Sequence, residues 1–313
     1  MPKVLISDSM DEIAVKVLKS NNIDVEVITS FTPEELQKNI DKYDGLIVRS
    51  ATKVTKDIIL SAKNLKIIGR AGAGVDNIDV ETAKDKNIIV MNTPGGNTNA
   101  TAEHAMALLF SLSRFITDAN TSTHKGLWEK KKFKGNELKD KYIGIVGFGN
   151  VGKRFAEMCF ALGLKINIYS KYFETIKNDY KNYNSLNLND LIKKSDFISF
   201  HCKPNKNNEP LISLKEIEMM KKSVLLINTA RGNLIDEQDL KISLEKGLIK
   251  GAALDVFSEE PAKENILFNT PNLILTPHIA ASTAEAQIIV AEKIANQFSD
   301  YFNSGKIINE VNL

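Results

Sequence analysis

Three glycines near the middle of the chain have the spacing of a phosphate-binding turn. Gly147, Gly149 and Gly152 form the pattern GFGNVG, which follows the apolar run YIGIV and opens a segment with helical periodicity. Glycines in such a turn let the backbone approach a pyrophosphate, and the helix that follows offers unpaired N–H groups and the positive end of its dipole. We therefore predict that this turn binds a dinucleotide, with Asn150 and Val151 at the start of the helix.

The position about 20 residues beyond this turn normally carries an acid that holds the ribose hydroxyls of NAD. This chain has Ser170 and Lys171 there, after the strand-like run INIY. A missing carboxylate removes a contact to NAD and also a charge that repels the 2′-phosphate of NADP. The sequence leaves the cofactor open between NAD and NADP, and we predict that NADP is accepted.

Four histidines are candidates for proton transfer. His104 and His124 lie in a long helical segment, where a packed or solvated histidine is the usual role. His201 follows the strand-like run DFISF, and His278 follows LILTP and precedes a helix. Ligands of open α/β sheets bind beyond the carboxyl ends of the strands, and Pro277 fixes the chain before His278, so this residue suits a base that must be held in place.

Two further side chains stand beyond strand ends. Arg231 follows LLINTA, where an arginine is either a surface ion pair or a clamp for the carboxylate of a 2-hydroxy or 2-oxo acid. Glu260 follows GAALDVFSE and precedes a proline, and alone it reads as a solvated loop residue. The residues by themselves make Arg231, Glu260 and His278 plausible catalytic groups.

Eleven short β-branched runs alternate with helix-period segments along the chain. This alternation predicts parallel sheets with crossover helices, and eleven strands with a central glycine turn predict two doubly wound α/β domains. A helix is expected over residues 97–120, and the pattern around Thr32 and Ser282 predicts two capping boxes at helix starts. Gly305 is expected to end the last helix.

Six segments resemble successive signatures of the D-2-hydroxyacid dehydrogenase family: GRAGAGVDNID, MNTPGGNT, GFGNVG, NTARGNLIDE, GAALDVFSEEP and TPHIAAST. Two others, VRSATKVT and KGLWEKKKFKGNELK, are similar to the branch of that family that oxidises 3-phospho-D-glycerate. The resemblance implies a Rossmann dinucleotide-binding domain at residues 96–282. It also implies a flavodoxin-like substrate domain formed by residues 1–95 and 283–313.

The resemblance also assigns roles to residues. It implies Arg231, Glu260 and His278 as the catalytic set, Asp255 as a ligand of the nicotinamide carboxamide and Thr229 as a further cofactor contact. Where the family usually has Thr-Pro after the histidine at position 201, this chain has Cys202-Lys203, so we expect these two residues near the adenosine ribose.

The substrate implied by this resemblance is a phosphorylated 2-hydroxy acid. Arg49 and Arg70 follow first-domain strands and are candidates for its phosphate, although ordinary surface arginines are an equal alternative; Ala73 and Gly74 lie in the signature after Arg70. The same catalytic set would serve a glyoxylate or hydroxypyruvate reductase, and some relatives are NAD-sensing corepressors instead. The family further implies a homodimer formed by the long helix and the Trp128 loop.

The composition of the chain limits the classes of partner and cofactor that we expect. The chain has 313 residues, with 41 Lys and Arg against 39 Asp and Glu, so net charge does not favour nucleic acid or a membrane as partner. Its two cysteines match no metal or disulfide spacing, and no apolar run reaches the length of a membrane span. We expect a cytoplasmic enzyme without a metal. Because the sequence stops soon after the last predicted helix, we also expect no regulatory C-terminal domain.

Overall fold

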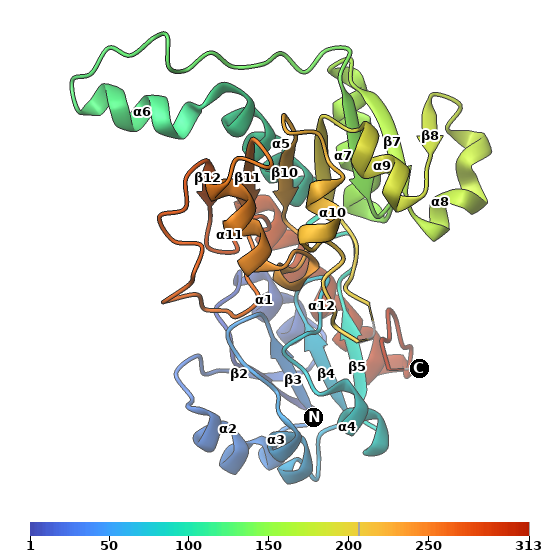
Figure 1. Ribbon diagram of the computed structural model, residues 1–313. Coiled ribbons are helices and arrows are strands. Elements are labelled where there is room, and N and C mark those ends of the chain that lie inside the picture. Colours follow the sequence, from blue (N-terminus) through green and yellow to red (C-terminus); the bar gives the residue numbers. More distant parts are fainter. Residues whose placement is uncertain (206, 313) are drawn as a thin grey trace. The chain divides into compact units, whose positions relative to one another are not determined.

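The computed structural model describes residues 1–205 and 207–312. The chain divides into two compact units, Met1–Asn97 with Ser282–Leu313 and, between them, Thr98–Ala281. Each unit contains a parallel sheet with helices on its faces (Figure 1). Among the described helices, none combines the length and apolar character needed to span a bilayer. The predicted class of two doubly wound α/β domains is confirmed.

The sheet of the first unit has five parallel strands in the order β2-β1-β3-β4-β5. This is the flavodoxin-like order. The strands are β1 (Lys3–Ile6), β2 (Asp24–Val27), β3 (Gly45–Val48), β4 (Ile67–Arg70) and β5 (Ile89–Asn92). The helices are α1 (Ile13–Ser20), α2 (Pro33–Asn39), α3 (Lys56–Ser61), α4 (Val80–Asp85) and α12 (Ala284–Ser304), with the 3-10 helix η1 (Ile40–Lys42).

The last helix, α12, packs on this first sheet because two strand glycines make room for it. A Cβ atom at Gly69 would lie 2.3 Å from the ring of Phe298, and one at Gly45 would lie 2.9 Å from the same ring. Phe298 and Ile294 are fully buried in the core that this packing forms. The chain after α12 then forms a bridge to β5 at Met91. The C-terminal segment is therefore part of the N-terminal unit.

Helix ends in this unit follow local sequence signals. Thr32 and Glu35 form the predicted capping box, with Pro33 in the first turn. Gly305 ends α12 in the left-handed conformation, as predicted. The second box is wrong: Thr283 caps α12 through the N–H of Ala286, because the helix begins one residue later than Ser282 would require.

The second unit has seven parallel strands in the order β12-β11-β10-β9-β6-β7-β8. Counted from β6, the order around the centre is the Rossmann pattern 3-2-1-4-5-6, with β12 added at the edge. The strands are β6 (Tyr142–Val146), β7 (Lys165–Tyr169), β8 (Tyr183–Ser185), β9 (Phe197–Phe200), β10 (Leu225–Asn228), β11 (Gly251–Leu254) and β12 (Leu273–Leu275). The helices are α5 (Thr98–Arg114), α6 (Ile116–His124), α7 (Asn150–Ala161), α8 (Lys171–Ile176), α9 (Leu188–Lys194), α10 (Leu214–Glu218) and α11 (Glu237–Glu245), with 3-10 helices η2 (Lys177–Asp179) and η3 (Gly232–Leu234).

Two predictions about this unit are corrected. The short strand β8 was not predicted, because its residues Tyr-Asn-Ser lack an apolar run. The single helix expected over residues 97–120 is two helices, α5 and α6, because Phe115 adopts a left-handed backbone with φ of 54°. After this break, α6 extends away from the sheet of its own unit (Figure 1).

Candidate active site

The glycine turn lies between β6 and α7, and each of its three glycines has a different environment. Gly147 has φ of +98°, and a Cβ there would lie 2.6 Å from the carbonyl oxygen of His201. A Cβ at Gly152 would lie 2.1 Å from the carbonyl oxygen of Gly147, so this glycine lets α7 pack closely on the turn. A Cβ at Gly149 would meet no atom within 4 Å. Contacts within the protein therefore explain why positions 147 and 152 require glycine. The space beside Gly149 is open.

This arrangement fits a dinucleotide. Gly149 caps α7 without a side-chain hydrogen bond, so the first N–H groups of α7, from Asn150 and Val151 onward, have no side-chain cap and face the open space at the positive end of the helix dipole. Thr229, which follows β10, is 7% exposed, and its hydroxyl has no hydrogen-bond partner within the described residues. An orphaned buried hydroxyl and an uncapped helix start are features that a bound phosphate-bearing cofactor would complete.

The segments expected at the adenosine end lie beside the same turn. The Gly147 N–H donates to the carbonyl of Tyr169 at 2.9 Å, which places the end of β7 next to the glycines. Ser170 follows and caps α8 by accepting the Phe173 N–H at 3.4 Å, while Lys171 is exposed. Cys202 lies on the other side, because a Cβ at Gly147 would be 2.8 Å from its Cβ. Ser170 and Cys202 therefore flank the turn, and the exposed Lys203 follows Cys202.

His201 serves the structure of this turn. Its Nε2 is 2.9 Å from the Ser199 hydroxyl, its ring lies 4.9 Å from that of Phe155, and its carbonyl contacts Gly147. Burial holds the pKa of His201 well below its usual value, so the ring is neutral. A neutral histidine packed under the glycine turn is a scaffold residue rather than a proton donor.

Arg231 stands at the carboxyl end of β10 in a turn fixed by its own backbone. The Asn228 side chain donates to the Arg231 carbonyl at 2.8 Å and accepts the Ala230 N–H at 3.0 Å. The next residue, Gly232, has no room for a side chain, since a Cβ there would be 1.8 Å from the carbonyl carbon of Phe257. The Arg231 turn therefore packs directly on the loop that leads to Glu260.

Glu260 and His278 form a close pair. His278 Nδ1 is 2.6 Å from Glu260 Oε2, and Glu260 Oε1 accepts the Phe257 N–H at 3.0 Å. Burial raises the pKa of Glu260, but the bonds from His278 and Phe257 and the positive charge of Arg231 outweigh it and leave the pKa below its usual value. Glu260 is therefore a carboxylate at neutral pH, with one oxygen fixed by the backbone and the other directed at the imidazole. The family resemblance implied Glu260 and His278 as members of one catalytic set, and the structure brings their side chains into contact.

The loop that carries His278 is organised by Asp255, at the end of β11. The Asp255 carboxylate accepts the hydroxyl of Thr276 at 2.5 Å and the N–H groups of Ile279 and Ala280 at 2.9 and 2.8 Å. Its backbone carbonyl accepts the His278 N–H at 2.8 Å. These bonds hold His278 in a left-handed backbone conformation with φ of 51°. Asp255 has no exposed surface, so its role toward a nicotinamide carboxamide stays a prediction, whereas its role in shaping this loop is shown.

His104 joins this network from α5. Its Nε2 lies 3.1 Å from the Thr276 hydroxyl and 3.3 Å from Asp255 Oδ1. Because the Thr276 hydroxyl gives its proton to Asp255, His104 Nε2–H is the donor. Sequence reasoning assigned His104 only a packed or solvated role, and it missed this contact because no local pattern connects residues so far apart. His124 ends α6 and is exposed.

The candidate substrate residues lie in the other unit. Arg49 follows β3, and Arg70 ends the neighbouring strand β4, where it pairs in register with Val48. Both arginines therefore stand at the carboxyl edge of the first sheet, with Ala73 and Gly74 in the turn beyond β4. The Arg49 guanidinium donates to the Ser9 carbonyl at 3.1 Å. A function in substrate binding stays a prediction for all four.

Comparison with known proteins identifies the family. Residues 106–280 match the family model described as D-isomer specific 2-hydroxyacid dehydrogenase, NAD binding domain. The match covers more than half of the chain, including the glycine turn and the Glu260–His278 pair. The chain belongs to the D-2-hydroxyacid dehydrogenase family. The second unit of this family member accordingly contains its NAD-binding domain, as the glycine turn predicted.

Two curated relatives of this D-2-hydroxyacid dehydrogenase have different activities. It is 41% identical over 312 residues to D-3-phosphoglycerate dehydrogenase of Archaeoglobus fulgidus, which covers 99% of this chain and 59% of the relative. It is 43% identical over 302 residues to hydroxypyruvate reductase of Thermotoga maritima, covering 93% and 97%. The solved structure of NAD+-bound 3-phosphoglycerate dehydrogenase from Entamoeba histolytica is similar with a TM-score of 0.83 and 31% identity, covering 100% and 99%. The chain thus spans about three fifths of the curated Archaeoglobus relative and nearly all of the reductase.

Proposed function

We propose that this protein oxidises 3-phospho-D-glycerate to 3-phosphohydroxypyruvate, with NAD or NADP as the hydride acceptor. The observation that carries the proposal is the Glu260–His278 pair at 2.6 Å, in one unit with Arg231 and an NAD-binding glycine turn. The relatives named D-3-phosphoglycerate dehydrogenase support the choice of substrate. The reaction is the reversible removal of a hydride from C2 and a proton from the C2 hydroxyl.

His278 takes the proton in this scheme. With Nδ1–H directed at Glu260, the lone pair of Nε2 is free to accept the hydroxyl proton while the C–O bond becomes a carbonyl. The carboxylate of Glu260 then stabilises the imidazolium that forms. Bound nicotinamide would supply the hydride acceptor. In the reverse direction His278 returns the proton to the oxygen of the 2-oxo acid.

Arg231 orients the substrate. A planar guanidinium binds a carboxylate through two parallel hydrogen bonds, and its charge polarises the neighbouring C2 oxygen as carbonyl character develops. The positive charge acts on the same loop, since it contributes to the lowered pKa of Glu260. Arg231 and Glu260 are thus close enough for one substrate to meet the guanidinium and the His278 imidazole together.

The cofactor proposal is that NADP is accepted about as well as NAD. Ser170 stands beside the glycine turn, where a carboxylate would repel the 2′-phosphate, and Lys171 and Lys203 are both exposed nearby. The Ser170 hydroxyl oxygen accepts the Phe173 N–H at the long distance of 3.4 Å. The hydroxyl proton remains available to donate to a phosphate or ribose oxygen.

Arg49 and Arg70 are proposed for the substrate phosphate. They stand at the carboxyl ends of neighbouring strands, the edge at which open α/β sheets bind ligands. The Arg49→Ala and Arg70→Ala variants should each raise the KM for 3-phospho-D-glycerate more than the KM for unphosphorylated D-glycerate. Lys53→Ala, an exposed cation in the same unit, serves as control. Equal effects of the arginine variants on both substrates would show that neither arginine contacts the phosphate.

The direct test of function is a substrate panel. Turnover is measured with 3-phospho-D-glycerate, D-glycerate, hydroxypyruvate and glyoxylate, each with both cofactors, for the parent and for His278→Ala. We expect the highest kcat/KM with the phosphorylated acid and a loss of about a hundredfold or more in the variant. Equal kcat/KM for phosphorylated and unphosphorylated acids would instead assign the protein to the reductases, the alternative that the Thermotoga relative favours. Absence of turnover on the whole panel would favour an NAD-sensing binding protein.

We also propose that two copies associate through α6 and the loop that contains Trp128. The Trp128 side chain is 79% exposed, and α6 extends away from its own unit (Figure 1). Sedimentation of Trp128→Ser should show a weaker dimer than the parent, whereas a parent that sediments as a monomer would contradict the proposal. A cytoplasmic location without nucleic-acid or membrane partners stays a prediction from composition.

A further inference from the structure

A small cavity lies in the second unit, at the amino ends of β10, β11 and β12. Leu225, Gly251 and Leu273 begin these three strands and line it, together with residues from the junction of α5 and α6. Because the strands are parallel, their amino ends lie opposite to their carboxyl ends, which are followed by Arg231 and Asp255. The cavity has a volume of about 150 Å³ and is distinct from the proposed active site.

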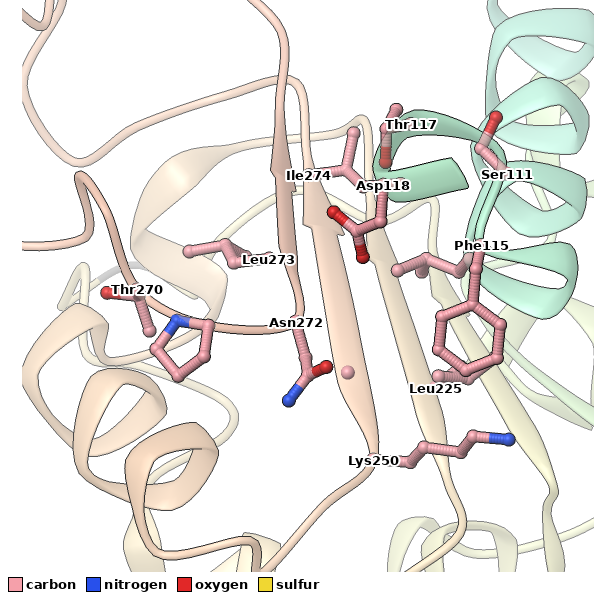
Figure 2. Close-up of a pocket in the computed structure, with 13 residues that line it drawn as sticks. Ser111, Phe115, Thr117, Asp118, Leu225, Lys250, Thr270, Asn272, Leu273 and Ile274 are labelled. Atoms are coloured by element: carbon pink, nitrogen blue, oxygen red, sulfur yellow. The ribbon is translucent and has the colours of Figure 1, made fainter. Parts of the chain in front are cut away.

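Two opposite charges line this cavity without pairing. Asp118, in the first turn of α6, forms no hydrogen bond or ion pair among the described residues, and Lys250, before β11, forms no ion pair there. The Lys250 amine instead lies 5.4 Å from the centre of the Phe115 ring. Figure 2 shows the Asp118 carboxylate and the Lys250 amine on different sides of the group of lining side chains. Asp118 is exposed and Lys250 is half-buried, so both charges are accessible to a ligand that enters the cavity from solvent.

The surroundings of Lys250 favour binding of an anion beside its amine. Burial and the nearby charge of Lys141 lower the pKa of Lys250 below its usual value, which means that its positive charge is poorly compensated. A ligand carboxylate would supply the missing negative charge. Asp118, for its part, can accept several hydrogen bonds from an ammonium group.

The wall of the cavity holds two residues in an unusual backbone conformation. Phe115 and Asn272 both have positive φ, 54° and 58°, although neither is glycine. Asparagine tolerates this region, but for an aromatic residue it is a costly conformation that recurs at functional sites. The Phe115 ring lies 5.4 Å from the Lys250 amine, and Asp118 follows three residues later in the first turn of α6.

We propose that this cavity binds a small zwitterion, an amino acid of roughly six to nine non-hydrogen atoms, because a cavity of this volume holds a molecule the size of benzene. The ligand's ammonium group pairs with Asp118 and its carboxylate with Lys250. The carbon chain between them contacts the apolar wall of Leu225, Leu273 and Ile274. A nucleotide or a sugar phosphate is too large for this volume.

Calorimetric titration of the full chain with a graded set of probes tests the proposal. L-alanine and L-valine carry the ammonium and carboxylate groups on the same carbon, whereas β-alanine and 4-aminobutyrate separate the two groups by one and two further carbons. Propionate and propylamine carry one charge each. We expect at least one zwitterion to saturate a single site and to bind at least tenfold more tightly than propionate or propylamine. The tightest member of the series reports the distance between the two charged side chains.

Variants locate the site. Asp118→Asn and Lys250→Gln should each weaken the tightest zwitterion at least tenfold, while Lys250→Arg retains most of the affinity. Asp140→Asn and Lys125→Gln remove the same charges from exposed positions outside the cavity and should leave binding unchanged. Circular dichroism and Tm of each variant establish that the fold is intact.

Four outcomes would overturn the proposal. The first is that no zwitterion saturates a site at millimolar concentration. The second is that binding persists unchanged in both Asp118→Asn and Lys250→Gln, and the third is that Arg231→Ala abolishes it, which would place the ligand in the active site. If instead Asp118→Asn weakens self-association and no probe binds, the cavity receives a side chain of a second copy and the proposal also fails. Since the readout is binding alone, the result does not depend on the proposed reaction.

Discussion

The Glu260→Gln substitution tests the centre of the proposed chemistry, because it removes a charge and leaves the shape nearly unchanged. If the new amide keeps its oxygen toward the Phe257 N–H, as Glu260 Oε1 is now at 3.0 Å, the amide nitrogen must face His278 Nδ1, at the present distance of 2.6 Å. An amide N–H there donates to Nδ1 and forces the imidazole proton onto Nε2. In that tautomer Nε2 can no longer accept the proton of a substrate hydroxyl.

The opposite orientation of the amide is also costly. Turning the oxygen toward His278 keeps the reactive tautomer but sets the amide N–H against the Phe257 N–H, which leaves two donors facing each other. Loss of a hydrogen bond to a charged group costs about 1.5 to 3 kcal/mol, which corresponds to about 10- to 150-fold in rate. With the added cost of the wrong tautomer, we expect Glu260→Gln to lower kcat by about 10² to 10⁴, the usual span of general acid–base catalysis.

The pH dependence gives a second, independent sign. In the parent, Glu260 loses its negative charge only when pH falls through a pKa that lies below its usual value, whereas the amide of the variant does not titrate. Because the pKa of Glu260 is below its usual value, its own titration does not produce a limb near neutral pH in the parent. The C2-deuterated substrate should show a larger isotope effect in the variant if proton transfer and hydride transfer are slowed together.

The matched control is Glu259→Gln, which makes the same chemical change at the neighbouring exposed residue. Its kcat and pH profile should equal those of the parent. The reasoning is refuted if Glu260→Gln remains within threefold of Glu259→Gln across the pH range, or if its loss is confined to KM.

Three further predictions follow from the same geometry. Arg231→Lys should lower kcat/KM for the acid about a hundredfold with little change in the KM for cofactor, since a point ammonium cannot reproduce a bidentate clamp; steady-state kinetics of both substrates checks this. Ser170→Asp should shift the ratio of kcat/KM values toward NAD at least tenfold, and a parent that already prefers NAD more than a hundredfold would contradict our interpretation of this position. Burial raises the pKa of Asp255 but the bonds from His104, Thr276 and two backbone N–H groups lower it further, so this carboxylate stabilises the fold above pH about 4 and ceases to do so as pH falls through its lowered pKa. Urea unfolding of Asp255→Asn should accordingly show a flatter loss of stability in acid, and an unchanged slope would contradict that.

The features that the sequence predicted are those set by residues close together in the chain. Eleven of the strands are recognisable in the sequence as short β-branched runs. The glycine turn is recognisable from six consecutive residues between a strand and a helix. The rule that ligands bind beyond the carboxyl ends of parallel strands selected Arg231 and His278 correctly as strand-end residues. Their catalytic roles remain predictions, but their placement follows from pattern alone.

The features that could not be predicted depend on contacts between distant segments or on compensated local strain. The sequence SLSRFITD contains no glycine or proline, so nothing in it indicates the break at Phe115. The strand β8 has too few residues to show alternation and exists because β7 offers it an edge. The cavity beneath α6 combines the two causes. It requires the break at Phe115, and it requires the starts of β10, β11 and β12, which are distant in sequence and meet under the helix.

The network around Asp255 shows how His278, the proposed proton acceptor, is held in place although it lies in a loop. Thr276 and His104 are 172 residues apart, yet both contact one carboxylate that also accepts two N–H groups of the His278 loop. These contacts act on the backbone on either side of His278, whereas its ring, within the described residues, is bonded to Glu260. Under the proposed mechanism, Asp255 therefore fixes the backbone of the loop and Glu260 assists proton transfer. A change at Asp255 should disturb where the imidazole lies, whereas a change at Glu260 should disturb which of its nitrogens carries the proton.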